Sequence, residues 1–117
     1  MSTKILVCAT GALLATAAFG QANGKGTRVR CDRACLDAYV DRYLDAMIAH
    51  DPAKAPFARG LKFTENGQRL EPGDGLWNTM TGKGTFRLFV TDVEAQQVAF
   101  FGSITEAGAG VMIGLRL

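Results

Sequence analysis

The sequence predicts one α+β domain, in which a long amphipathic helix precedes a mostly antiparallel sheet. Apolar residues between positions 32 and 50 recur at intervals of three and four, the spacing of one helix face. Between positions 61 and 71, two short segments flank an Asn-Gly pair, which is typical of a tight hairpin turn. After position 85, segments rich in Phe, Val and Ile have the composition and alternation of strands. Helices followed by successive strands indicate the α+β class.

Size and composition limit the function classes. The chain has 117 residues, enough for one domain and too few for two. An apolar content of 48% is ordinary for a globular protein and excludes general disorder. The net charge of +2 shows no basic excess, so no nucleic-acid partner is expected.

The first part of the chain has the pattern of a secretory signal peptide, predicted over residues 1–22. Lys4 precedes an apolar and small-residue run over 5–18, and small residues follow at the spacing of a cleavage site. The run is shorter than the ~20 apolar residues that span a bilayer, although an uncleaved anchor or a buried first helix is the alternative. We expect a flexible leader over 23–30 and a folded domain over 31–117. That domain is expected to be secreted or periplasmic, with no membrane association after cleavage.

The long helix is expected to begin after Asp32, a suitable N-cap, and to end near His50, because Pro52 prevents its continuation. Asp51 and Pro52 then suit the cap and the first position of a second, short helix through 53–58. The expected apolar face of the long helix consists of Leu36, Tyr39, Val40, Tyr43, Leu44, Met47 and Ile48. Its opposite side carries Asp37, Asp41, Arg42 and Asp45.

The remaining elements are a hairpin, a third short helix and three strands. The hairpin strands are expected over 61–64 and 68–71, around the Asn66-Gly67 turn. Asp74 is expected to cap the third helix, with Gly82 at its C-terminal end. The later strands are expected over 85–91, 97–105 and 111–117. The last strand ends within an apolar run, so an edge strand, a dimer contact and a truncated strand all stay open.

Three segments together resemble the nuclear-transport-factor-2-like superfamily. They are CDRACLDAYVDRYLDAMIAHDP at 31–52, KFTENGQRLEPGDGLW at 62–77 and QVAFFGSI at 97–104. The nearest likeness is to an exported branch of that superfamily, known as a domain of unknown function. The superfamily also includes ketosteroid isomerase, scytalone dehydratase and the SnoaL-type polyketide cyclases.

This resemblance implies one long and two short helices packed on a curved antiparallel sheet, enclosing a cone-shaped cavity. A small apolar or amphipathic molecule is the expected partner, and a homodimer is the usual assembly. Superfamily members usually finish with two or three full strands beyond the point where this chain ends.

The implied activity is a cofactor-free isomerase, dehydratase or cyclase. The alternative is a non-catalytic ligand-binding or dimerisation scaffold. Neither a cofactor nor a metal is expected, and the chain has no serine-hydrolase elbow and no phosphate loop.

Cys31 and Cys35 are a candidate disulfide. Their spacing at the helix start permits a bond if Cys31 lies outside the regular helix, and an exported chain permits disulfides. A free dithiol and a metal site are the alternatives. A zinc site normally needs four ligands, and His50 lies roughly 25 Å away along the helix.

His50, Asp51 and Glu65 are the candidate catalytic residues. His50 and Asp51 either act as an acid–base pair or simply end one helix and cap the next. Glu65 is either a general base inside the cavity or a solvated residue beside a turn. A catalytic role requires Glu65 to face a pocket. A scaffold instead requires it to be exposed, with the pocket filled by Phe63, Trp77, Phe86 and Phe100.

Tyr39, Tyr43, Asn66 and Trp77 are the candidate ligand-binding residues. The two tyrosines lie one turn apart on the helix face expected to look toward the sheet, where a phenol could donate to a ligand oxygen. Asn66 either orients a carbonyl or only forms the turn. Ordinary packing is the alternative for both tyrosines and for Trp77.

Overall fold

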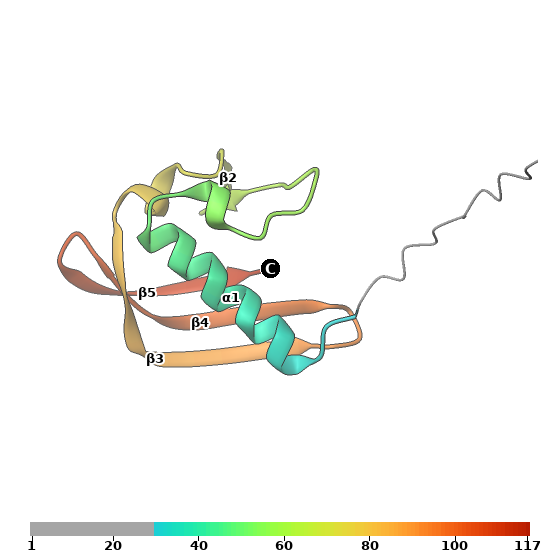
Figure 1. Cartoon of the computed structure of the whole chain (residues 1–117). Coiled ribbons are helices and arrows are strands. Elements are labelled where there is room, and N and C mark those ends of the chain that lie inside the picture. Colours follow the sequence, from blue (N-terminus) through green and yellow to red (C-terminus); the bar gives the residue numbers. More distant parts are fainter. Residues whose placement is uncertain (1–29) are drawn as a thin grey trace, which may run out of the picture.

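A single α-helix crosses one face of a three-stranded antiparallel sheet in the computed structural model (Figure 1). The structure describes residues 30–117. The predicted signal peptide and all of the leader except Arg30 therefore lie outside the described residues. The α+β class is as expected. Along the chain the elements are α1 (Arg33–Ile48), η1 (Pro52–Lys54), β1 (Thr64–Glu65), β2 (Gln68–Arg69), η2 (Gly75–Asn78), β3 (Met80–Asp92), β4 (Gln97–Glu106) and β5 (Ala109–Arg116).

The start of α1 follows directly from local chemistry. The Asp32 carboxylate accepts a hydrogen bond from the Cys35 N–H at 2.9 Å, which satisfies one of the four unpaired donors of the first turn. Cys31 precedes the helix and forms a disulfide with Cys35, with Cα atoms 5.1 Å apart. Both features agree with the expectations from the sequence.

The apolar face of α1 packs against the sheet and forms the core. Its buried residues are Leu36, Val40, Tyr43, Leu44, Ala46 and Met47. From the other side the core is completed by Trp77, Met80, Val98, Phe100 and Ile104. Burying these side chains contributes roughly 1.5–3 kcal/mol for each large aliphatic or aromatic group. This packing holds α1 across the sheet.

The acidic side of α1 contacts β3 instead of lying wholly in solvent. The pairs are Asp37 with Thr91, Asp41 with Arg87, and Asp45 with Lys83. A bulge in β3 brings the spacing of Lys83 and Arg87 close to the spacing of Asp45 and Asp41 on α1. Lys83 lies opposite Ile104 and Arg87 opposite Gly102, so four residues of β3 cover only two of β4. Two strand residues span about 7 Å, which is close to the rise of about 6 Å over four helical residues.

The three-stranded sheet has an apolar face on each side. The order is β3-β4-β5, with Leu88, Phe101 and Gly114 in one cross-strand row. Alternate residues point inward to the core, and the others point outward. The outward set includes five large apolar side chains that are roughly half exposed or more: Phe86, Leu88, Val90, Phe101 and Met112. We call this set the outer apolar face.

The prediction of two short α-helices beside the long one is wrong. Each is a short 3-10 turn, η1 and η2. The second helix cannot run through 53–58, because Pro56 lacks an N–H and forces Ala55 into an extended conformation with ψ of 142°. The third ends at Asn78, because Met80 pairs with Glu106 in the sheet.

Strand bounds also differ from the expectations. β3 begins at Met80 rather than at 85, because Gly82 and Lys83 pair with Thr105 and Ile104 of β4 instead of forming a turn. A Cβ on Gly84 would overlap the Ser103 side chain, so glycine is needed there. β1 and β2 shrink to two residues each, although the Asn66-Gly67 turn forms as expected, with φ of 48° and 78°.

Within residues 30–117, no helix is long and apolar enough to cross a membrane. The same part of the chain contains no group of three or more His, Cys, Asp or Glu residues placed to hold a metal ion.

Candidate functional site

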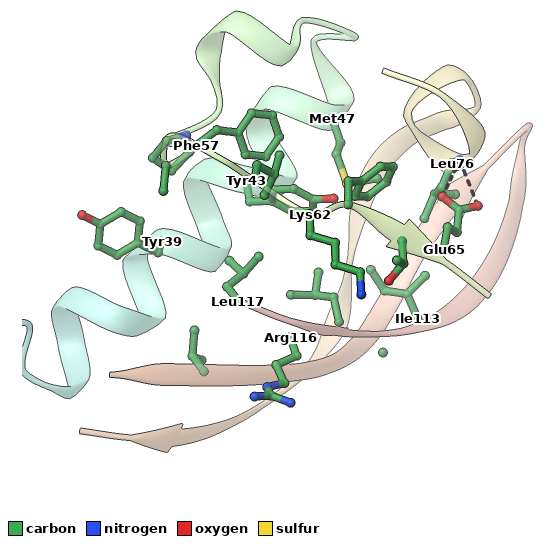
Figure 2. Close-up of a pocket in the computed structure, with 18 of the residues that line it drawn as sticks. Tyr39, Tyr43, Met47, Phe57, Lys62, Glu65, Leu76, Ile113, Arg116 and Leu117 are labelled. Carbon is green, nitrogen blue, oxygen red and sulfur yellow. Dashed lines mark hydrogen bonds between the residues drawn. The ribbon is translucent and has the colours of Figure 1, made fainter. Parts of the chain in front are cut away.

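A cavity of about 960 Å³ lies between α1, the segment 56–66 and β5 (Figure 2). Small-molecule sites span about 300–1,000 Å³, so this volume is at their upper end. The helix contributes Leu36, Tyr39, Tyr43 and Met47 to the wall. The wall is therefore mainly apolar on the helix side, with phenol groups as its polar members.

The opposite wall is the free edge of β5. All residues of 111–117 border the cavity, although only alternate side chains of a strand can point to one face. Val98 and Leu117 exchange both backbone hydrogen bonds, at 3.1 and 2.9 Å. In an antiparallel ladder such pairs alternate, so the N–H and C=O groups of Met112, Gly114 and Arg116 point away from β4. These main-chain groups therefore face the open edge.

Tyr43 presents its phenol beside a buried aromatic cluster. The Trp77 Nε1–H donates to the Tyr43 oxygen at 3.3 Å. The two rings meet edge to face with centroids 5.4 Å apart, and Phe57 packs 6.1 Å from Tyr43. Trp77 is fully buried behind Tyr43 and is not part of the cavity wall. The structure therefore places Tyr43 in the site and Trp77 in its support.

Burial raises the pKa of the Tyr43 phenol above its ordinary value of 10.0. The negative charge of Glu65 raises this pKa further, whereas the hydrogen bond from Trp77 lowers it. A raised pKa keeps the phenol neutral, and a neutral phenol can donate a hydrogen bond.

The Tyr43 pKa can be measured directly, since the chain has two tyrosines. In a Tyr39→Phe variant Tyr43 is the one phenol. We expect its tyrosinate absorbance to titrate above pH 10 in the folded protein and near 10 in denaturant. Because the folded pKa is the higher one, the associated stability is present below pH 10 and is lost as the pH rises through the folded pKa. A midpoint near 10 in the folded protein would contradict this prediction.

Glu65 lies at the end of β1, half-buried, and borders the cavity. Its two carboxylate oxygens accept a hydrogen bond from the Leu76 N–H in the first turn of η2, with N···O distances of 3.1 and 3.2 Å (Figure 2). Gly75 permits this approach, because a Cβ there would come within 2.5 Å of the carboxylate. Glu65 and Tyr43 therefore border one cavity, and the carboxylate is held by a main-chain donor.

Tyr39 and Asn66 border the same cavity at its margins. The Arg42 guanidinium lies 4.1 Å from the centre of the Tyr39 ring, a cation–π distance. Figure 2 shows the Tyr39 hydroxyl pointing away from Tyr43 and Glu65. Asn66 is exposed in the hairpin turn, with φ of 48°. The pair is therefore peripheral to the arrangement of Tyr43 and Glu65.

His50 and Asp51 do not border the cavity. The His50 N–H bonds to the Met47 carbonyl at 2.9 Å and the Asp51 N–H bonds to the Ala46 carbonyl at 3.1 Å, which is a Schellman helix end. The His50 Nδ1–H donates to the Trp77 carbonyl oxygen. The Asp51 carboxylate accepts from the Ala53 N–H at 3.0 Å. His50 therefore ends α1 and Asp51 caps η1, as in the structural alternative. Neither residue borders the cavity that Glu65 borders.

Sequence reasoning missed two parts of this wall. One is Lys62, which borders the cavity immediately before β1. The other is the edge of β5, including Ile113 and Leu115. The alternation of Val111, Ile113 and Leu115 is a local signal for one apolar face of the strand, but no local signal in the sequence marks which side chains and main-chain groups border a cavity.

Comparison with known families adds one match. A family described as Domain of unknown function (DUF8021) matches residues 29–113, most of the chain. Neither a curated protein nor a solved structure matches.

Proposed function

The chain belongs to the DUF8021 family, and we propose that its domain binds a small apolar or amphipathic molecule in the cavity between α1 and β5. The observation that carries this proposal is one cavity, with a wall slightly more apolar than polar, that brings together the Tyr43 phenol and the Glu65 carboxylate. Polar groups that converge in a partly apolar cavity are typical of small-molecule sites. We further propose an NTF2-like fold, supported by a long helix lying across an antiparallel sheet with a cavity beside it.

As a catalyst, the domain would move a proton without a cofactor. The Glu65 carboxylate would take a proton from a carbon next to a ligand carbonyl, and the Tyr43 phenol would donate a hydrogen bond to the carbonyl oxygen. Returning the proton from Glu65 to another carbon completes an isomerisation. Transfer of that proton to a neighbouring hydroxyl, which then leaves as water, completes a dehydration. His50 and Asp51 do not border the cavity, which favours Glu65 as the base.

The mature domain is proposed to be secreted or periplasmic. The Cys31–Cys35 disulfide supports this location, because disulfides persist in oxidising compartments.

The test of the binding function uses N-phenyl-1-naphthylamine, a neutral apolar fluorophore. We expect saturable binding to the wild-type domain. An Ile113→Trp change, which narrows the cavity beside β5, should weaken binding at least about tenfold, or 1.4 kcal/mol. Leu88→Trp is the matched control, since Leu88 lies on the outer apolar face and does not border the cavity. Equal binding by both variants, with unchanged circular dichroism, would contradict the proposal.

A dimerisation scaffold is the second candidate function, favoured by the outer apolar face. Large exposed apolar patches commonly mark interaction sites. Two copies could cover these faces by packing sheet on sheet. Sedimentation velocity over a concentration series distinguishes a monomer from this homodimer.

A further inference from the structure

We propose that the cavity selects a ligand whose apolar body carries a carboxylate, which Lys62 binds as a counter-charge. This inference rests on the proposed binding function and adds the chemical class of the ligand. It follows from sorting the charged side chains of the cavity wall by the partners that they already have.

Most charged groups of the wall are already engaged. The Glu65 carboxylate accepts the Leu76 N–H. The Glu106 carboxylate accepts the Thr79 hydroxyl at 2.6 Å. Arg116 donates through Nε and Nη2 to the Gln97 amide oxygen, at 3.1 and 2.7 Å. The two carboxylates are negatively charged and do not attract a ligand carboxylate. By strand alternation the Arg116 side chain lies on the outward side of β5, the side of Met112, and not on the side of Ile113 and Leu115.

Lys62 differs from them. Within residues 30–117 its ammonium makes no hydrogen bond or ion pair that meets ordinary distance limits. Figure 2 shows the Lys62 side chain extending from the segment before β1 toward β5, on the side of Ile113 and Leu117. Lys62 is exposed, so its attraction for an anion is the modest attraction of a partly exposed ion pair, which added salt weakens.

The cavity wall therefore offers two unlike kinds of surface. Lys62 supplies a positive charge, and Tyr43, Met47 and Phe57 supply apolar and aromatic surface. A ligand carboxylate at Lys62 would leave the apolar body of the ligand to contact this second surface. An ionised acid with an aromatic or aliphatic body matches both kinds of surface.

Two fluorophores with one aromatic skeleton test the inference. The anionic member is 1-anilinonaphthalene-8-sulfonate, whose sulfonate stands in for a carboxylate, and the neutral member is N-phenyl-1-naphthylamine. We expect Lys62→Met to weaken binding of the anionic fluorophore by about fivefold, the upper range for a partly exposed ion pair. Binding of the neutral fluorophore should stay within about twofold, and added salt should weaken only the anionic binding to wild type.

Lys54→Met is the matched control. It removes the same charge from η1, where Lys54 pairs with Asp51 outside the cavity wall, and should leave both fluorophores unaffected. If Lys62→Met weakens both fluorophores equally or neither, the charge selection is overturned while the binding function stands. If wild type binds neither fluorophore, the binding function and the inference fail together. Thermal unfolding of both variants confirms that the fold is unchanged.

Discussion

Trp77→Ala is expected to lower the free energy of unfolding by about 3–5 kcal/mol, the range for removing a buried Trp or Phe. Trp77 is fully buried, and its ring packs against Tyr43 and Phe57 with centroids 5.4 and 5.9 Å away. The substitution also removes the Nε1–H that the Tyr43 oxygen accepts. The loss therefore combines a cavity with a missing hydrogen bond.

Urea unfolding followed by circular dichroism measures this change, because the chain has one tryptophan and the variant has none for fluorescence. Phe101→Ala is the control. It removes a similar ring from the outer apolar face, where Phe101 is 49% exposed, and should cost less than about 1 kcal/mol. Equal losses in the two variants would show that the aromatic cluster behind Tyr43 is not the centre of the core.

Gly75→Ala is expected to cost about 2–4 kcal/mol and to release the Glu65 carboxylate. Gly75 has φ of +63°, a conformation that costs a residue with a Cβ roughly 1–2 kcal/mol. The new Cβ would also come within 2.5 Å of the carboxylate, which must rotate away from the Leu76 N–H. Losing that charge-assisted hydrogen bond adds about 1–2 kcal/mol.

Gly60→Ala separates the two contributions. Gly60 has a similar φ of +75°, but a Cβ there has open space around it, so only the backbone cost is expected. Chemical denaturation of both variants, alone and with Glu65→Ala, completes a double-mutant cycle. With Glu65→Ala present, the cost of Gly75→Ala should fall to that of Gly60→Ala. A cost that stays unchanged would show that Glu65 is not anchored by η2.

The helix could be predicted closely because its ends depend on residues that are near one another in the sequence. Asp32 and the Pro52 that follows the helix act within a few residues of the ends that they define. The start of β3 could not be predicted in this way. Gly82 and Gly84 favour a turn locally, and only the contact with β4, which is distant in the sequence, makes them part of a strand. Gly84 in particular is needed only because Ser103, far along the chain, approaches it.

The candidate site likewise has parts that local sequence signals predict and parts that depend on long-range contacts. Tyr43 was found from helical spacing, and Glu65 from its place before a turn, so both could be predicted locally. The anchoring of Glu65 by Leu76 could not, because it depends on how η2 meets the hairpin. His50 and Asp51 looked catalytic in sequence, but the requirements of a helix end and a helix start account for their contacts.

The open edge of β5 changes how mutagenesis of this cavity is interpreted. The amide and carbonyl groups of Met112, Gly114 and Arg116 are the same whichever side chain occupies those positions. A guest held partly by them would keep that share of its affinity through an alanine scan, so the scan would understate the contribution of this wall. Proline at position 114 deletes one such donor and leaves the hydrogen bonds to β4 in place, since that N–H points away from the neighbouring strand.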